Sequence, residues 1–246
     1  MELEFLLLIS AIIFFASLIH GSIGFGFPMI STPLIALYTD IQTAIIYTLV
    51  PTLLVNIISI SSEGTLKEAF KRFWPLAIYS GFGSILGTII LISFNSEFFK
   101  LLLAFAILSY LALDMVKVEI SWIKENPKLS QAIFGSLAGL LGGLTNAMAP
   151  ILIVYTLESK FTKKEIIQAS NICFFVGKVI QIILFTIIST FTFKEVGISF
   201  ISLLTVACAL FIGVRLKKYI NPKIYKNIIK MLLLCISMIL IIKYFN

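Results

Sequence analysis

Apolar residues follow one another almost from one end of this chain to the other, with only short polar breaks between the runs. They make up 59% of the 246 residues, which is more than a soluble domain of this size can hide from water. Runs such as residues 3–19 and 200–214 approach the roughly 20 apolar residues that a helix needs to cross a bilayer. Because backbone groups in lipid must be satisfied within the segment, these runs are expected to be helices. The sequence therefore predicts an all-α polytopic membrane protein.

The charged and reactive residues argue against several other classes of protein. A net charge of +7 fits cations that flank membrane spans and set their orientation better than it fits a nucleic-acid-binding surface. The three cysteines lie in apolar runs without CxxC or Cys/His spacing, so no zinc site or disulfide framework is expected. The chain has one histidine and lacks the Walker A, HExxH and GxSxG motifs. We therefore expect no enzymatic activity, no metal site, no cofactor and no nucleic-acid partner.

Two pairs of neighbouring apolar stretches are each joined by glycines and followed by proline. The pairs are residues 3–20 with 23–38, and residues 129–143 with 146–157. The glycines at the joins are Gly21, Gly24, Gly26, Gly139, Gly142 and Gly143, and the prolines are Pro28, Pro33 and Pro150. Because glycine weakens a helix and proline interrupts its hydrogen bonds, each pair is predicted to be a broken or re-entrant helical element.

The positions of the cations distinguish two ways of threading the chain through the membrane. The basic loops lie around residues 67–72, 117–128, 160–164 and 215–230. If each broken element crosses once, about eight spans with parallel halves result, and the basic loops fall on both faces. If each broken element turns back, all the basic loops lie on one face, which the positive-inside rule favours. In that case the basic loops are cytoplasmic, both termini are extracellular, and the two halves of the chain are inverted repeats.

The two halves also resemble each other in the spacing of particular residues. The aligned residues are Gly26, Pro33 and Tyr38 with Gly143, Pro150 and Tyr155, then Thr48 with Ser170 and Asn56 with Lys178, then Gly87, Asn95 and Lys100 with Gly213, Asn221 and Lys226. We therefore predict transmembrane repeats at residues 1–117 and 129–246, joined by a cytoplasmic linker at 118–128. Duplicated halves that are interrupted at corresponding places indicate a transporter. The alternative role of these glycines is close helix packing.

Two motifs at the start of the halves resemble a known family. They are HGSIGFGFPMISTP in the first half and GSLAGLLGGLTNAMAP, followed by KKEIIQASN, in the second. Both are similar to the corresponding stretches of TauE/SafE permeases, the sulfite-exporter-like membrane proteins. The stretches around Gly81, Gly87 and Gly213 look like the later helices of each half, so the resemblance covers nearly the whole chain. It implies export or uptake of sulfite, sulfonates or related small anions.

Lys178 is the most informative single residue. It lies near the middle of the apolar segment 166–190, about 17 Å from either end at 1.5 Å per residue. A lysine side chain extends only about 6 Å, so it cannot reach the interface. A charge at this depth costs about 2.5–3.5 kcal/mol, and no Asp or Glu lies in the middle of an apolar segment, since Asp40 and Asp114 are near segment ends. An anionic substrate is one source of countercharge, and burial of a neutral lysine is the alternative.

The broken elements are expected to complete the site. A half-helix that starts within the membrane directs free backbone N–H groups and its dipole at that point, which attracts anions. The candidate backbone groups and neutral donors are those of Ser22, Gly24, Gly26, Gly142, Gly143, Thr145 and Asn146. Hydroxyl groups of serine and threonine often bond back to their own helix instead.

Further polar residues follow each broken element. Asn171, Lys178 and Gln181 are spaced seven and three residues apart, so they share one helix face that should point into the protein. Asn56 is the polar position in the first half. These residues either bind substrate or form hydrogen bonds between helices. His20, beside the first glycines, is a candidate for proton coupling or a structural hydrogen-bonding group.

These observations favour a secondary transporter for small, sulfur-containing anions that works by alternating access around a central site. The expected partners are the anion and the lipid bilayer of the cell membrane, and a homodimer is left open. An anion channel lined by Lys178 and a membrane subunit that needs another protein are the alternatives.

Overall fold

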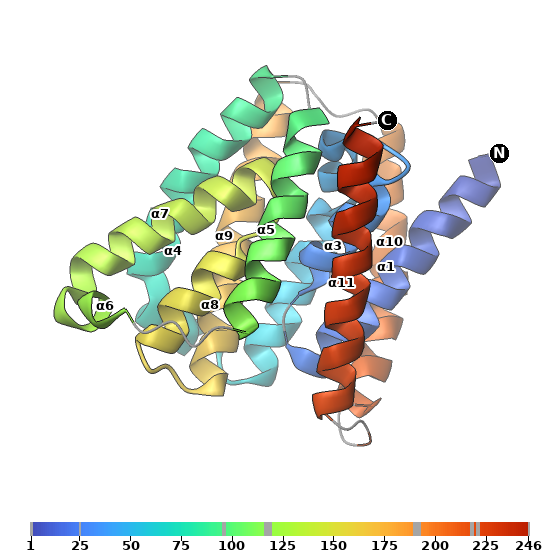
Figure 1. Ribbon diagram of the computed structural model, residues 1–246. Helices are drawn as coiled ribbons and strands as arrows, with labels where there is room; N and C mark the ends of the chain where they lie inside the picture. Colours follow the sequence, from blue (N-terminus) through green and yellow to red (C-terminus); the bar gives the residue numbers. More distant parts are fainter. Residues whose placement is uncertain are drawn as a thin grey trace.

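The chain folds into a bundle of helices, which confirms the predicted all-α class (Figure 1). The computed structural model describes residues 2–24, 26–94, 97–115, 120–188, 193–216, 219 and 222–245, and no strand occurs among them. The helices are α1 (Glu2–Ile23), α2 (Phe27–Ala36), α3 (Ile41–Ser62), α4 (Leu66–Ser93), α5 (Glu97–Met115), α6 (Ser121–Glu125), α7 (Pro127–Thr145), α8 (Ala149–Glu158), α9 (Lys163–Ile187), α10 (Phe193–Leu216) and α11 (Pro222–Phe245).

Six helices in the described part of the chain are long and apolar enough to cross a membrane. They are Leu3–Ile23, Ile41–Ser62, Leu66–Ser93, Lys163–Ile187, Gly197–Leu216 and Asn227–Phe245. Helices α5 and α7 have 19 residues each, and the short apolar helices α2 and α8 have 10 each. The protein is therefore a multi-pass membrane protein, and the expected number of about eight spans is reached only when α5 and α7 are added to the six.

Three helices begin at a side chain that caps their N-terminus. Asp40 accepts a hydrogen bond from the backbone of Thr43 at the start of α3, and Thr65 does the same for α4. Thr162 and Glu165 form a reciprocal capping box at the start of α9. Such side chains satisfy backbone N–H groups that have no partner within the helix, so they define where each helix leaves its loop.

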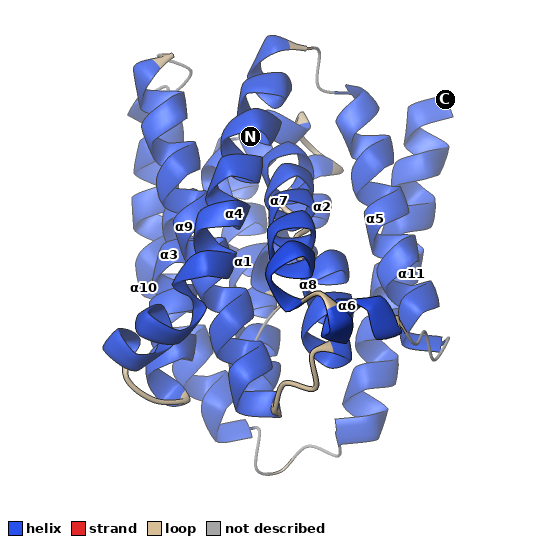
Figure 2. Ribbon diagram, turned by 90° about the vertical axis from the view of Figure 1, so that its left-hand side faces the viewer, coloured by secondary structure: helices blue, strands red, loops and turns tan. Residues whose placement is uncertain are grey.

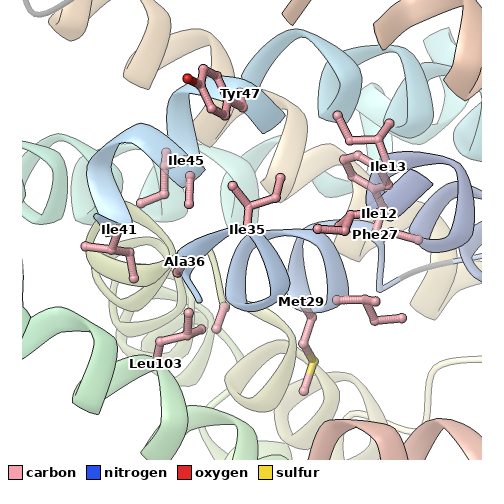
Figure 3. Close-up of a cluster of buried hydrophobic side chains, with 14 of the residues drawn as sticks. Ile12, Ile13, Phe27, Met29, Ile35, Ala36, Ile41, Ile45, Tyr47 and Leu103 are labelled. Atoms are coloured by element: carbon pink, nitrogen blue, oxygen red, sulfur yellow. The ribbon is translucent and has the colours of Figure 1, made fainter. Parts of the chain in front are cut away.

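Helix α2 reverses the direction of the chain between two parallel helices. Near their N-terminal ends, the rings of Phe5 in α1 and Tyr47 in α3 lie 6.3 Å apart. Near their C-terminal ends, His20 in α1 lies within hydrogen-bond distance of Ser59 in α3. The two helices therefore run in the same direction, and α2 runs back between them. Figure 3 shows the apolar packing of this region, with Phe27 beside Ile13.

Helix α4 aligns the corresponding helices of the second half. Ser80 of α4 approaches Gly139 of α7, and Ser84, one turn later, approaches Gly143. The contacts follow the same order along both helices, so α4 and α7 are parallel. Helix α4 also runs parallel to α9, because its first turns contact the start of α9 and its Gly81 faces Val176 and Ile180. Helices α7 and α9 are thus parallel to each other, and the short α8 runs back between them.

The long helices α3 and α9 are antiparallel where the two halves meet. Gln168, near the start of α9, donates a hydrogen bond to the carbonyl of Glu63 at the end of α3. Because α1 is parallel to α3 and α7 is parallel to α9, α1 and α7 run in opposite directions. Figure 1 shows the N- and C-terminal ends of the chain toward one end of the molecule and α6 at the other.

One long helix of each half packs against two helices of the other half. Helix α4 packs on α7 and α9, and α10 packs on α1 and α3. Helices α5 and α11 pack together, and Figure 2 shows them side by side at one edge of the bundle. In the predicted linker, α6 occupies residues 121–125 and α7 already begins at Pro127. Residues 116–119, which include Lys117 and the predicted boundary, lie outside the described residues, as do Asn95, Lys217, Lys218 and Asn221.

The helix boundaries give a different register for part of the predicted repeat. Pro28 and Pro150 are both the second residue of a short helix, α2 or α8. The same offset relates Asp40 to Thr162, the N-terminal caps of α3 and α9. It also relates Thr48 to Ser170 and Asn56 to Lys178, so a single offset of the sequence covers all of these pairs. The predicted alignment of Pro33 with Pro150 is therefore replaced by Pro28 with Pro150.

Candidate functional site

Lys178 lies in the interior of the bundle. Its side chain is 1% exposed, and its ammonium donates a hydrogen bond to the Oε1 of Gln181, one turn further along α9. The Nε2 of Gln181 donates in turn to the carbonyl of Gly143 at 3.1 Å. A short chain of hydrogen bonds thus connects the buried cation to the last turn of α7.

The polar face of α9 points into the protein, as its spacing predicted. Asn171, Lys178 and Gln181 are each 1% exposed. The Nδ2 of Asn171 donates to the carbonyl of Gly24 at 2.9 Å and to that of Ile167 at 2.7 Å. Asn171 therefore ties α9 to the first broken element, whereas Gln181 ties it to the second.

The first break lies between α1 and α2. Gly24 and Gly26 have φ values of 98° and 105°, a left-handed conformation that glycine adopts without steric cost. The backbone N–H of Phe27 donates to the Nδ1 of His20 at 3.1 Å. Since Nδ1 is the acceptor, Nε2 carries the proton and donates to the Oγ of Ser59 at 2.7 Å. In this conformation His20 holds the break in shape and connects it to α3.

The second break lies between α7 and α8 and centres on Asn146. This residue has a φ of 70° and ends α7, with its backbone N–H donating to the carbonyl of Gly142 at 2.9 Å. Its Nδ2 donates to the hydroxyl of Thr32 at 2.7 Å and to that of Thr48 at 3.1 Å. Asn146 was expected to be a neutral donor to an anion, and in this structure its amide donates to two hydroxyl groups of the first half.

The glycines predicted to form the second break belong to a continuous helix instead. Gly139, Gly142 and Gly143 all lie within α7, which continues to Thr145, and α8 starts at Ala149. A Cβ atom at Gly139 would lie 1.9 Å from the carbonyl oxygen of Ser80 in α4. These glycines allow close approach of α4 and α7. The free N–H groups expected at Gly142 and Gly143 are therefore not at the start of a half-helix.

The two hydroxyl groups predicted as neutral donors are already engaged. The Oγ of Ser22 donates to the carbonyls of Leu18 at 2.9 Å and Gly213 at 3.1 Å. The Oγ1 of Thr145 donates to the carbonyl of Leu141 at 2.7 Å. Both bond back to their own helix, so neither hydroxyl proton is available to an anion in this conformation.

The two breaks differ in how tightly they are filled. Among the described residues, no atom lies within 4 Å of the place where a Cβ on Gly26 would be, and this glycine is partly accessible to solvent. The residue at the corresponding place of the second break is Met148, which is buried. Its side chain packs against Gly142 and Gly177 and so fills the space between α7 and α9.

Asn56 is the buried polar residue of α3 that lacks a protein partner. It is 1% exposed, and neither its Nδ2 nor its Oδ1 has a hydrogen-bond partner in the described part of the chain. It lies one turn before Ser59, so the two side chains share a face of α3. Ser17, Thr88 and the Oδ1 of Asn146 are also buried without a partner among these residues.

The sequence did not single out every polar residue of this region. Thr32 and Ser59, which bind Asn146 and His20, lie in apolar stretches and had no spacing signal of their own. Thr48 was visible only through its correspondence with Ser170. Among the described residues, no three His, Cys, Asp or Glu side chains lie close enough together to hold a metal ion.

A surface cavity of about 400 Å³ lies away from these breaks. It is lined by the loop after α2, the start of α5 and the end of α11, and both Asp40 and Lys100 contribute to it. Lys243 donates to the carbonyl of Leu37 at 2.7 Å, and its ammonium lies 5.8 Å from the centre of the Tyr38 ring. These contacts attach the end of α11 to the end of α2.

Comparison with known proteins agrees with this architecture. The family described as sulfite exporter TauE/SafE matches residues 9–241. No curated protein and no solved structure gives a match. The family is one of sulfite-exporter-type membrane permeases, and the match begins within α1, ends within α11 and includes both breaks. This helical, multi-pass membrane protein therefore belongs to the sulfite exporter TauE/SafE family.

Proposed function

We propose that the protein is a secondary transporter of small, sulfur-containing oxyanions or organosulfonates, with its binding site around Lys178. The observation that carries this proposal is the burial of one lysine at the centre of the bundle, where the hydrogen bond that its ammonium makes within the described part of the chain is to the neutral oxygen of Gln181. An unbalanced charge at such depth costs about 2.5–3.5 kcal/mol. A bound anion would balance the charge and so recover much of this cost.

Alternating access is the transport mechanism that we propose for this site. Helices α1 and α7 run in opposite directions, so the tips of the two broken elements lie toward opposite ends of the bundle. Asn171 of α9 bonds to Gly24 in one tip, and Asn146 in the other tip bonds to Thr48 of α3. These contacts support inverted repeats in which each tip opens the central site to one side.

The same arrangement supports one orientation in the membrane. The first turns of α4 and α9, which carry Lys67 and Lys163, lie together because Arg72 forms an ion pair with Glu165. The positive-inside rule assigns this end to the cytoplasm. Both termini would then be extracellular.

Flux into proteoliposomes tests the proposed function. The purified chain is reconstituted alone and offered sulfite, thiosulfate, methanesulfonate, sulfate and acetate. Lys178→Met should abolish flux of the preferred anion, because it removes the countercharge but keeps most of the side-chain volume. Because Lys178→Met also leaves the Oε1 of Gln181 without its donor, recovery of folded protein is measured for this variant before its flux is compared. Lys163→Met, an exposed change on the same helix, serves as the control.

Three results would contradict the proposal. Wild-type flux through Lys178→Met would remove this residue from the mechanism. Single-channel currents without saturable counterflow would assign the protein to the anion channels instead. Absence of flux from the correctly folded chain for every anion tested would favour a membrane subunit that needs a partner.

A further inference from the structure

We infer that the substrate is a singly charged oxyanion that still carries a proton, and that Asn56 recognises its O–H group together with a neighbouring oxygen. This inference rests on the proposed function, because it concerns the anion bound at Lys178. Hydrogen sulfite, in which one oxygen is protonated and another is free, has the required chemistry.

The unsatisfied amide of Asn56 is the first observation behind this inference. The amide offers a donor at Nδ2 and an acceptor at Oδ1, and neither has a protein partner among the described residues. Leaving a buried polar group without a partner costs about 1–3 kcal/mol. A ligand that satisfies both atoms must itself present an acceptor and a donor side by side. A fully deprotonated oxyanion presents acceptors only.

The position of Asn56 places this amide near the first break and at a height close to that of Lys178. Ser59, one turn further along α3, meets His20, which accepts from the N–H of Phe27 next to the open space at Gly26. The contact between Glu63 of α3 and Gln168 of α9 provides a common reference height for these antiparallel helices. At 1.5 Å per residue, Asn56 lies about 10 Å from this contact along α3, and Lys178 lies about 15 Å from it along α9. The difference in height is about 5 Å, and α3 and α9 pack against each other. The ammonium of Lys178 is bonded to Gln181, further along α9, so it turns toward Asn56 when the two share a ligand.

The charge of the region indicates how many negative charges the ligand carries. The described residues of the helices around Asn56 and Lys178 place their other Lys, Arg, Asp and Glu side chains toward the helix ends. Among the described residues of α1, α3 and α9, the buried titratable side chains are Lys178 itself, His20, which Ser59 contacts, and Tyr47 and Cys173, which are neutral when protonated. One ammonium balances one negative charge. A dianion would leave a second charge in a low-dielectric interior, which is costly.

Asn56 and Lys178 also correspond to each other in the two halves. Each lies one turn before a residue that bonds to the first helix of its own broken element, Ser59 to His20 and Gln181 to Gly143. The two halves therefore share recognition of the anion. Lys178 in the second half balances its negative charge, and Asn56 in the first half forms hydrogen bonds with its O–H group and a neighbouring oxygen.

The pH dependence of binding to the purified, full-length protein tests the inference. Apparent affinity for total sulfite, measured by calorimetry from about pH 6 to about pH 9, should fall as the second proton of sulfite dissociates, approaching tenfold for each pH unit. Selenite loses its second proton at a higher pH, so the midpoint of its profile should move upward accordingly. A flat profile, or one midpoint shared by both anions, would overturn the inference, since a shared midpoint reports a protein group.

Substitution of Asn56 provides a second readout. Asn56→Leu should leave thermal stability unchanged or raised, because it removes an unsatisfied polar group, and should weaken sulfite binding most at low pH. Ser17→Ala, which also removes an unpartnered buried group, should keep the wild-type profile. Wild-type affinity at every pH in Asn56→Leu would contradict the role of Asn56. Loss of binding in Lys178→Met with a flat wild-type profile would reject this inference alone and leave the proposed transport function standing.

Discussion

Gly24 and Asn146 occupy corresponding places at the tips of the two broken elements, and each is hydrogen-bonded to a long helix of the opposite half. Both have left-handed backbone angles, with φ values of 98° and 70°. The carbonyl of Gly24 accepts from Asn171 in α9, and the side chain of Asn146 donates to Thr48 in α3. The tips are therefore connected to the other half by a few polar contacts, which are easier to exchange than a packed apolar interface.

Removal of the Asn146 side chain should weaken one of these connections. Asn146→Gly keeps the left-handed backbone but loses the hydrogen bonds to Thr32 and Thr48, so unfolding should become easier by about 1–3 kcal/mol. The free energy of unfolding of Asn146→Ala should be about 1 kcal/mol lower than that of Asn146→Gly, because alanine does not favour a positive φ. Thermal unfolding in detergent measures both. Equal stability of the two variants would show that the backbone conformation is not strained by alanine.

The contact between α4 and α7 should not tolerate a side chain at its closest point. Gly139→Ala places a methyl group 1.9 Å from the carbonyl oxygen of Ser80, so the helices must separate and the protein should be strongly destabilised. Gly197→Ala in α10 is the matched control, because no atom of the described residues lies within 4 Å of its Cβ position. It should be neutral or stabilising by about 0.5–1 kcal/mol. The reverse order of stability in thermal unfolding would contradict the packing.

His20 should tolerate only a residue that can both donate and accept. His20→Gln can accept from Phe27 and donate to Ser59, so folded protein should be recovered at close to the wild-type level. His20→Leu leaves the N–H of Phe27 without its acceptor and should lower the unfolding temperature. If His20 also carries the coupled proton, His20→Gln should transport without responding to a pH gradient. A retained response would assign coupling to another group.

The orientation of the chain can be measured with single cysteines in a variant that lacks the native ones. Cysteines introduced for Lys67, in the first turn of α4, and for Lys160, in the loop between α8 and α9, should react with a membrane-impermeant reagent from the cytoplasmic side. A cysteine introduced for Thr39, after α2, should react from the outside. Reaction of the first two positions from opposite sides would exclude the inverted arrangement.

The spacing of residues in the sequence was enough to predict some parts of the candidate site and not others. The polar face of α9 could be predicted because Asn171, Lys178 and Gln181 repeat with helical spacing. The second break was expected between the stretches 129–143 and 146–157, within a few residues of its place between α7 and α8. The assignment of Gly139, Gly142 and Gly143 to the break was wrong, because glycines also suit a helix that packs closely on a neighbour. These glycines pack against Ser80 and Ser84 of α4 and remain helical. The helix ends at Asn146 instead.

By itself, the sequence determined that this chain is a helical membrane protein with two interrupted elements and a lysine in its interior, because apolar runs, glycine, proline and charge act locally on the backbone. Only the tertiary structure decided which polar groups remain without partners. Ser22 and Thr145 bond to their own helices, Asn146 finds Thr48, and Asn56 finds no partner among the described residues. Those outcomes depend on the directions and close contacts of helices far apart in the chain, which residue spacing within one helix does not encode.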